Sequence, residues 1–407
     1  MKKDDIFQQF SLEEISKSAL DEFVRQGAQA MIQKAIQEKV EEFIQASNTK
    51  VVRNGYLPER KILTPAGTLR VKQPRVRDEK NKSPFKSSIL PPYARRSPSI
   101  EAVISTLYLK GVGTSQFGEA LEALLGSKAK GLSSTTITRL KRAWEKEYLN
   151  WSKRDLTGEE YIYVWADGIY FNVRLGSDRP CVLFLMGANS QGEKKLIAIY
   201  DGERESKLSW ESVLRDLKKR GLKTAPQLAI GDGALGFWAA LEEIYPKTKA
   251  QRCWVHKTAN VLDKMPKSTQ EKAKSMIHDI YLAETKEEAE VAFDEFLERY
   301  ELKYPKSCEC LRKDREALLA FYDFPAEQWS HIRTTNPIES TFATIRHRAK
   351  QTKGCGSRKA TLAMVYKLAE GAEKKWRKLR GHKQITKIVQ GIQFKDGVEV
   401  QEHKIVA

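Results

Sequence analysis

The sequence predicts an α/β protein whose sheet-forming region lies in the middle of the chain, between helical segments. Residues 160–256 contain three successive apolar, β-branched and aromatic runs and then alternate helix, strand, helix and strand. Residues 257–330 are polar and strongly helical, and apolar residues recur at helical intervals in residues 11–46 and 99–150. We therefore expect one α/β core that follows helical regions and is interrupted by an all-α insertion.

The chain of 407 residues carries a formal charge of +18, which is concentrated in two regions. Residues 51–97 hold twelve Lys and Arg against three Asp and Glu, and residues 336–407 hold sixteen against six, so the rest of the chain sums to −1. Two basic regions on a nearly neutral body predict a polyanionic partner, most simply nucleic acid. The alternative is a protein that is merely soluble and basic, which the clustering disfavours.

Composition also bears on the compartment. No apolar run reaches the roughly 18 residues of a membrane span, and the first ten residues lack the apolar segment of a secretion signal. Five cysteines, an odd number without framework spacing, favour a reducing compartment. We expect a cytoplasmic protein that has no membrane partner.

Changes in composition divide the chain into seven segments. The apolar stripe of the first segment packs either on the rest of the chain or on a second subunit. We expect a helical region suited to dimerisation at 1–50, a basic hairpin and linker at 51–98, a helix-turn-helix-like DNA-binding domain at 99–150, the first part of the core at 158–256, an all-α insertion at 257–333, the last part of the core with basic C-terminal helices at 334–380, and a polar, frayed tail at 381–407.

Two N-terminal segments present cations at spacings that suit DNA. A turn at residues 65–67 joins two short strands with alternating cations, although such charges also protect an exposed edge strand. In the third helix of residues 99–150, Ile137, Leu140 and Trp144 are expected to face the core. The residues on the opposite face are of types that contact bases and phosphates in a major groove. Three short helices also commonly pack together without any role in DNA binding. The candidate DNA-contacting residues are Arg70, Lys72, Arg75 and Arg77, and Thr135, Thr136, Thr138, Arg139, Lys141 and Arg142.

Two Asp-Gly pairs end strands of the predicted core. Asp167 closes the first strand, residues 161–167, and Asp232 closes the fourth, residues 227–232. The element order is that of a ribonuclease-H-like fold, in which the first and fourth strands are neighbours, so the two carboxylates would converge at one end of the sheet. Asp-Gly is also a common turn, and Asp232 would also serve as the cap of the helix that follows.

A third carboxylate belongs to a helix-start signature. Asn336 is a preferred N-cap, Pro337 suits the first helical position, and Glu339 falls at the third. Glu339 therefore either turns back on its own cap or serves a site. The helix and the turn after it are rich in cations that suit phosphates: Arg346, Arg348, Lys350, Lys353, Arg358 and Lys359.

The three acidic segments, Asp167-Gly, Asp232-Gly and Asn336-Pro-Ile-Glu339, with a helical insertion before the glutamate, resemble the DDE transposases of bacterial insertion sequences, and more narrowly the Mutator-type family. The likeness covers about residues 53–377. It implies an enzyme that binds the inverted repeats at transposon ends in double-stranded DNA, nicks there, and joins the released 3′-OH to target DNA. Because two ends must be brought together, it also implies at least a homodimer.

Three further residues are candidates to support the site. Cys253-Trp-Val-His256 matches the family's Cys-x-x-His element. Cys253 and His256 could begin a zinc site, but no second pair has suitable spacing, so packing or hydrogen bonding beside the site is favoured. His256 is also a candidate contact to DNA near the cleaved phosphate. Trp329 either stacks on an unpaired base or is a core tryptophan.

The chemistry of phosphodiester displacement asks for these residue types. Two divalent cations about 3.5–4 Å apart stabilise the entering and leaving oxygens, and hard cations prefer carboxylate ligands. We expect Asp167, Asp232 and Glu339 to be catalytic and to hold two Mg²⁺ ions, with Mn²⁺ as a substitute and Asp167 bridging both. The alternative functions are a ribonuclease-H-like nuclease without transposition and a catalytically inactive DNA-binding regulator.

Overall fold

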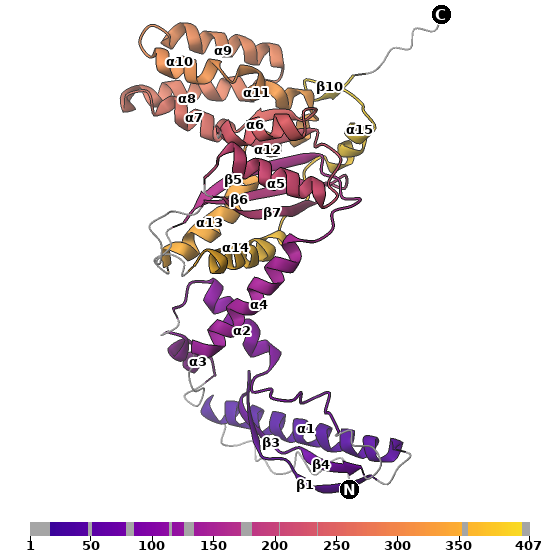
Figure 1. Cartoon of the computed structure of the whole chain (residues 1–407). Coiled ribbons are helices and arrows are strands. Elements are labelled where there is room, and N and C mark those ends of the chain that lie inside the picture. Colours follow the sequence, from indigo (N-terminus) through magenta and orange to yellow (C-terminus); the bar gives the residue numbers. More distant parts are fainter. Residues whose placement is uncertain are drawn as a thin grey trace, which may run out of the picture. The chain divides into compact units, whose positions relative to one another are not determined.

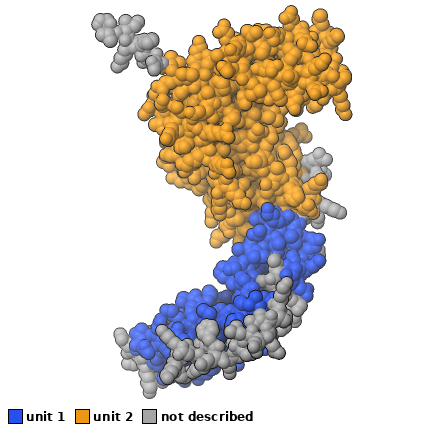
Figure 2. Space-filling view, turned by 180° about the vertical axis from the view of Figure 1, so that it is seen from behind, with its two compact units in different colours: residues 1–140 blue, residues 141–407 orange. Residues whose placement is uncertain are grey.

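In the computed structural model the chain forms two compact units, Met1–Leu140 and Lys141–Ala407 (Figure 2). Each unit is described by itself. No helix in the described part of the chain is long and apolar enough to cross a membrane. The structure describes residues 17–47, 51–78, 85–113, 116–125, 134–171, 181–202, 204–233, 235–351 and 357–400.

The first unit begins with a long helix and four short strands: α1 (Lys17–Ala46), β1 (Val51–Tyr56), β2 (Arg60–Thr64), β3 (Gly67–Val71) and β4 (Pro74–Asp78). Strands β2 and β3 form the antiparallel hairpin that the sequence predicts, and β1 pairs with β4. Gly67, at the turn between these strands, has a φ of 92°. Residues with a side chain rarely adopt this backbone conformation, so the turn favours glycine.

Helix α1 packs on the strands of its own chain. Ile36 is fully buried in a cluster with Ile62, Leu69 and Val71. The helix also covers the edge of β3, because the Lys72 backbone N–H donates to Gln33 Oε1 at 3.0 Å and Gln33 Nε2 donates back to the Lys72 carbonyl. The apolar stripe of α1 is therefore used, at least in part, within the subunit.

Three helices follow: α2 (Pro98–Leu109), α3 (Phe117–Leu125) and α4 (Ser134–Ser152). Their shared core contains Ile100, Ile104, Phe117 and Ile137. Proline at the first position of α2 matches the preference for a residue whose missing N–H costs nothing there.

A five-stranded mixed sheet forms the centre of the second unit (Figure 1). Its strand order is β7-β6-β5-β8-β9, with β5–β6 and β6–β7 antiparallel and β5–β8 and β8–β9 parallel. The expectation that the first and fourth strands of this region are neighbours is confirmed. The strands are β5 (Tyr163–Tyr170), β6 (Cys181–Ala188), β7 (Lys194–Gly202), β8 (Leu228–Gly231) and β9 (Lys249–Arg252).

Helices cover both faces of this sheet (Figure 1). On one face, α5 (Lys207–Lys219) and α6 (Leu235–Ile244) form a core with alternate strand residues, and Trp210 of α5 packs edge-on against Phe237 of α6. The opposite face receives α13 (Asn336–Gln351), whose Phe342 meets Phe184 of β6 with ring centroids 5.4 Å apart. Helix α14 (Arg358–Glu373) contacts β7.

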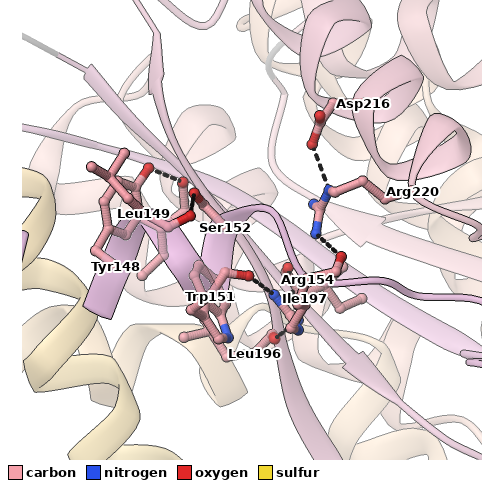
Figure 3. Close-up of polar contacts among 10 residues, drawn as sticks. Tyr148, Leu149, Trp151, Ser152, Arg154, Leu196, Ile197, Asp216 and Arg220 are labelled. Atoms are coloured by element: carbon pink, nitrogen blue, oxygen red, sulfur yellow. Dashed lines mark hydrogen bonds and ion pairs between the residues drawn. The ribbon is translucent and has the colours of Figure 1, made fainter. Parts of the chain in front are cut away.

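The end of α4 is fixed to the edge strand β7 by a polar network (Figure 3). Arg154 donates to the carbonyls of Trp151, Leu196 and Ile197, at 2.8–3.2 Å. Arg220, which is ion-paired to Asp216 at 2.8 Å, donates to the Arg154 carbonyl. These bonds satisfy carbonyls at an exposed sheet edge, where unpaired backbone groups would otherwise invite strand addition.

Every element between β9 and α13 is helical, as the sequence predicts for the insertion. The last strand of the sheet, β9, ends at Arg252, and Trp254 already belongs to a helix. The helices are α7 (Trp254–Leu262), α8 (Lys267–Leu282), α9 (Lys286–Tyr300), α10 (Pro305–Arg312), α11 (Arg315–Leu319), η1 (Ala320–Asp323), η2 (Ala326–Gln328) and α12 (Trp329–Ile332).

The expectation of a frayed tail after residue 381 is wrong for residues 382–400. They form η3 (His382–Gln384), α15 (Ile385–Val389) and a small hairpin of β10 (Phe394–Lys395) and β11 (Val398–Glu399). Asp396 and Gly397, both at positive φ, make the turn, and Gly397 exchanges backbone hydrogen bonds with Tyr322 and Ala326. The Asp-Gly pair between short strands was the available sequence signal for this hairpin.

The contact between Phe342 and Phe184 predicts that packing of α13 on the sheet contributes to the stability of the second unit. Phe342→Ala should lower the free energy of unfolding by about 3–5 kcal/mol, because it removes a fully buried aromatic side chain and leaves a cavity. Urea denaturation measures this value. Leu208→Ala, at a side chain that is 74% exposed on α5, serves as the control and should change stability by less than about 0.5 kcal/mol. Equal small effects of both substitutions would contradict the packing role of Phe342.

Candidate active site

Asp167 lies within β5 and not at its end, which corrects the predicted position. It pairs across the sheet with Phe184, and β5 continues for three more residues. The parallel pairing with β8 does end here, at Ala166 opposite Gly231. Asp167 and Asp232 are thus the next residues after the last parallel pair, so the register carries both to the same end of the sheet.

Alternation along the strands also puts both aspartates on the same face. Trp165 pairs with Ile230, and side chains two residues further along point to the same side as these two. Trp165 donates from its indole to the His331 carbonyl, so this is the face covered by the segment that leads into α13. The fold therefore directs both carboxylates toward the helix that carries Glu339.

The environment of Asp167 disfavours its charged form. The residue is only 7% exposed, and its hydrogen-bond donor among the described residues is the neighbouring Gly168 N–H, at 2.8 Å from Oδ1. Burial, followed by the negative charge of Asp232, raises the pKa of Asp167 to about 6. A cation bound here would relieve both penalties.

The backbone of Asp232 is held by two donors. The Trp238 indole N–H and Arg252 Nη1 both donate to the Asp232 carbonyl, each at 2.8 Å. The Arg252 guanidinium also stacks on the Trp238 ring, 4.5 Å from its centroid, and pairs with Asp314 of the insertion at 3.4 Å. The position of Asp232 is therefore tied to the helical insertion.

Glu339 occupies the first turn of α13 and is about one-third exposed. The helix already includes Asn336, and the carbonyl of Thr335 accepts from the Ile338 and Glu339 N–H groups. The predicted cap at Asn336 is thus displaced by one residue, within the usual uncertainty of helix ends. The Glu339 carboxylate accepts a hydrogen bond from the Thr335 hydroxyl at 3.2 Å.

Cys253 and His256 lie beside Glu339, at the start of α7. The Thr335 hydroxyl lies 3.3 Å from Cys253 Sγ and 3.3 Å from His256 Nδ1, and His256 Nε2 lies 3.7 Å from Glu339 Oε1. The hydrogen bond with Cys253, together with the charges of Asp167 and Asp232, outweighs burial and raises the pKa of His256 to about 9. An imidazolium therefore faces the carboxylates at neutral pH.

The Cys253 thiol is nearly fully buried. Burial raises its pKa, but hydrogen bonds with His256 and Thr335 and the charge of His256 oppose this effect and lower the pKa overall. Cys253 therefore helps to hold the Thr335 hydroxyl in place by hydrogen bonding. Cys308 and Cys310 are buried in α10, within the insertion.

Glu205 is a fourth carboxylate at this end of the sheet, and the sequence analysis missed it. It lies just before α5 and contacts Gly168, where an added Cβ would overlap its carboxylate. Burial, then the charges of Asp232 and Asp167, raise the pKa of Glu205 to about 7. An acidic residue next to a helix N-cap, here Ser206, is common in sequences. The sequence therefore contained no distinct signal that Glu205 lies at this end of the sheet.

The donors at this sheet end are carboxylate oxygens, the ligand type that Mg²⁺ and Mn²⁺ prefer. The side chains are not drawn together into a preformed cage: in the described residues no three His, Cys, Asp or Glu side chains are grouped closely enough to hold a metal ion. The residues fit a hard divalent cation in the chemistry of their oxygen ligands, and burial followed by mutual repulsion raises the pKa of both Asp167 and Glu205.

Trp329 packs among aromatic residues near the site's supporting segment. Its ring meets Phe321 and Tyr322 edge-on, with centroids 5.3 Å and 4.8 Å away, and its indole donates to the Phe324 carbonyl at 2.7 Å. These contacts are those of the core tryptophan that the sequence left as one of two alternatives.

The candidate DNA-contacting residues lie in several places. In the first unit, Arg70, Lys72, Arg75 and Arg77 are exposed, whereas Arg139 is exposed but paired with Glu101 at 2.9 Å. Arg348 is only 3% exposed, in contrast to its neighbours on α13. Lys353 lies outside the described residues. Thr135, Arg142, Arg346, Lys350, Arg358 and Lys359 are exposed, and Thr136 and Lys141 are half-buried.

A cavity of about 830 Å³ opens next to Asp232, between the core and the insertion. Gly233 forms part of its wall, and Lys257 and Asp314, which are ion-paired, lie inside it with Arg252. Three further lysines, Lys264, Lys306 and Lys313, line it at exposed positions. The cavity is thus predominantly basic.

The pKa of Asp167 predicts how stability depends on pH when no divalent cation is present. Well below pH 4 the carboxyl is protonated in both the folded and unfolded states, since its ordinary pKa is 3.8. Between pH 4 and 6 the unfolded state loses its proton first, so the folded state loses stability as pH rises. Asp167→Asn removes this ionisation while its amide oxygen still accepts from Gly168.

Urea denaturation in EDTA at pH 4 to 7 measures this dependence. Relative to Asp167→Asn, the wild type should lose about 2–3 kcal/mol over this range, since a shift of two pKa units corresponds to roughly that energy. Asp279→Asn, at an exposed position on α8, should follow the wild type. Parallel curves for wild type and Asp167→Asn would show that Asp167 has an ordinary pKa.

Known proteins agree on the family. A model described as "Transposase, Mutator family" matches residues 1–379. The transposase for insertion sequence element IST2 of Acidithiobacillus ferrooxidans is 49% identical over 288 residues, which cover 69% of this chain and 95% of that protein. The transposase for insertion sequence element IS6120 of Mycolicibacterium smegmatis is 49% identical over 295 residues, covering 72% of this chain and 91% of that protein.

A likeness to a solved structure is much weaker. The Drosophila P element transposase strand transfer complex contains a chain that is 11% identical, with a TM-score of 0.30 and coverage of 73% of this chain and 83% of that chain. This value is too low to support an argument about the site. The family match and the two bacterial relatives do not depend on it: the chain belongs to the Mutator family of transposases.

Proposed function

We propose that this transposase uses a ribonuclease-H-like core, in which Asp167, Asp232 and Glu339 are the catalytic carboxylates. The observation that carries the proposal is the β5–β8 register, which takes Asp167 and Asp232 to one end of the sheet, on the face that receives α13. The raised pKa of Asp167 supports it, because buried carboxylates that repel each other are typical of functional sites.

The three carboxylates would hold two Mg²⁺ ions, with Mn²⁺ as a substitute and Asp167 shared by both. When bound, such ions stabilise negative charge on the entering and leaving oxygens of a phosphodiester and activate the attacking oxygen. The role of this chain's residues is to fix those ligands. Thr335 orients Glu339 by a hydrogen bond, and Arg252 and Trp238 hold the Asp232 backbone.

The reaction proceeds in two displacements at phosphorus. In the first, water attacks a phosphodiester at a transposon end, and the bond to the 3′ oxygen breaks, which leaves a 3′-OH. In the second, that 3′-OH attacks a target phosphodiester, so one bond forms as another breaks and no external energy source is required. Both displacements need the same charge stabilisation, so one carboxylate site suffices for both.

DNA recognition is assigned to the first unit and to the basic regions. The exposed cations of β3 and β4 and the outward face of α4 would bind the inverted repeats at the element ends. The basic cavity beside Asp232 would receive the DNA backbone near the reacting phosphate. Because two ends must meet, the active species is at least a homodimer. The inactive regulator remains as the competing proposal, and DNA nicking separates the two.

Asp167→Asn should abolish Mg²⁺-dependent nicking, by at least about 10³-fold, while end binding stays within about twofold of the wild type. The assay uses a labelled duplex that carries the element's inverted repeat, with gel electrophoresis for nicking and a mobility shift for binding. Asp279→Asn is the matched control and should nick normally. Undiminished nicking by Asp167→Asn would remove this residue from the site, and absence of nicking by the wild type would favour the regulator.

Arg75 and Arg77, both exposed on β4, should contribute phosphate contacts. Replacing both with Ala should weaken binding to specific and random duplexes alike, and should reduce the slope of log K against log salt by roughly two. Lys272 and Lys274, both exposed on α8, provide the control pair. A loss confined to the specific duplex, or an unchanged slope, would contradict a backbone-contacting role for β4.

A further inference from the structure

Tyr93 is held in a backbone conformation that a bulky side chain rarely adopts. Its φ is 64°, and it is one of two residues other than glycine that have a positive φ in the described part of the chain. The other is Asp396, a residue type that tolerates this conformation, in the turn of the β10–β11 hairpin. Strain of this kind persists where the surrounding structure enforces it, and it gathers at binding sites.

The turn that carries Tyr93 is fixed by hydrogen bonds. The Ala94 backbone N–H donates to the Pro91 carbonyl at 3.2 Å, so Tyr93 takes the third position of a four-residue turn, where a positive φ usually calls for glycine or asparagine. Arg60 Nη2 donates to the carbonyls of Pro91 and Ala94, at 2.9 Å and 2.7 Å. Further backbone hydrogen bonds join the residues after the turn to Leu63 of β2. The conformation of Tyr93 is therefore imposed by its surroundings.

This turn displays the Tyr93 side chain instead of burying it. Tyr93 is 95% exposed, whereas Ile62 and Leu69 of the adjacent hairpin are buried. Packing within the subunit therefore does not offset the backbone strain. A rigid turn needs little ordering when a partner binds, and an aromatic ring offers a large contact area with few rotatable bonds. Both properties suit a binding residue.

The surface next to the turn is basic. Arg95 is exposed, and Arg96 Nη2 donates to Thr136 Oγ1 of α4 at 3.1 Å. Burial, followed by the charge of Arg139, lowers the pKa of Arg96, and Arg95 adds to this effect against the opposing charge of Glu101. Three guanidinium groups thus gather between the turn and α4. Their charge is complementary to the phosphates of duplex DNA, whose grooves offer apolar sugar and base surfaces to a ring.

We propose that Tyr93 is a DNA-contacting residue of the first unit. Its ring enters a groove of the duplex and packs against sugars and bases, while Arg95, Arg96 and the outward face of α4 bind the same duplex through its phosphates. The inference rests on the proposed function, because it assumes that this face of α4 binds the element ends. It adds a contact that depends on no charge.

The test is a mobility-shift titration of the full chain on a labelled duplex that carries the inverted repeat, at several salt concentrations. Tyr93→Asn removes the ring but keeps a residue that tolerates the turn. It should weaken binding by about tenfold, the order expected when one contact between a ring and a base is lost. The slope of log K against log salt should stay unchanged, because no phosphate contact is removed.

Three further variants complete this titration. Arg95→Ala should reduce the salt slope by about one, in contrast to Tyr93→Asn. Tyr93→Phe, which retains the ring, should bind within about twofold of the wild type. Leu302→Ala, at a side chain that is 96% exposed in the helical insertion, is the control and should bind normally. Equal losses for Tyr93→Phe and Tyr93→Asn would overturn the packing of the ring, in favour of a contact made by the hydroxyl.

Stability and oligomeric state without DNA separate this contact from its alternatives. Tyr93→Asn and Tyr93→Gly should melt at or above the temperature of the wild type, because they relieve strain at a positive φ and remove no buried side chain. A lower melting temperature for both would overturn the inference, in favour of a structural role. A shift of the subunit equilibrium in sedimentation velocity would also overturn it, since Tyr93 would then pack on a second copy of the chain.

The outcomes keep this inference apart from the proposed function. Normal binding by Tyr93→Asn, together with a reduced salt slope for Arg95→Ala, would overturn the role of Tyr93 and leave DNA binding by the first unit standing. A reduced salt slope for Tyr93→Asn would overturn the uncharged contact. A wild type that does not bind the inverted-repeat duplex would overturn both.

Discussion

Repulsion between carboxylates at one end of a buried sheet is the constraint around which this site is built. The parallel pairing of β5 with β8 ends one residue before Asp167 and Asp232, so backbone hydrogen bonds that stabilise the core also bring two negative charges together. Desolvation is the larger cost, and together with the charge of Asp232 it raises the pKa of Asp167 to about 6. The fold tolerates this arrangement because the surrounding core is large and rigidly packed on both faces.

The elements around the aspartates are held by contacts that do not use the carboxylates. Arg252 fixes the Asp232 carbonyl, stacks on Trp238 and pairs with Asp314, so β9, α6 and the insertion meet at a single guanidinium. Phe342 anchors α13 to β6 beneath Glu339. Positioning of these elements is therefore carried in part by main-chain acceptors and aromatic contacts.

The sequence was sufficient to predict that the first and fourth strands are neighbours, that an all-α insertion follows them and that the two aspartates meet at one sheet end. Periodicity indicates the elements, and their order along the chain matches a known fold in which these strands pair. It was not sufficient for Glu205, whose position depends on how a loop passes two glycines that are distant from it in sequence. The contact of His256 with Glu339 joins residues 83 positions apart and has no local pattern. The hairpin at Asp396 was missed for a different reason, since its turn signal was present but lay in a polar stretch.

The charge at this end of the sheet indicates that binding of DNA would require basic residues in addition to the carboxylates. Four carboxylates, those of Asp167, Asp232, Glu205 and Glu339, lie at this end of the sheet, and the cations that act on Asp167 are His256 and Arg346. Without a bound divalent cation the negative charge would therefore oppose the approach of a phosphodiester. The basic cavity beside Asp232 provides attraction a short distance away, where it does not neutralise the carboxylates. In the proposed function, this separation would let the region attract DNA through lysines and arginines while its carboxylates bind divalent cations. In a protein that only bound DNA, carboxylates beside a basic cavity would weaken the attraction that its cations exert on phosphates, so this arrangement supports the proposed catalytic role over a binding-only role.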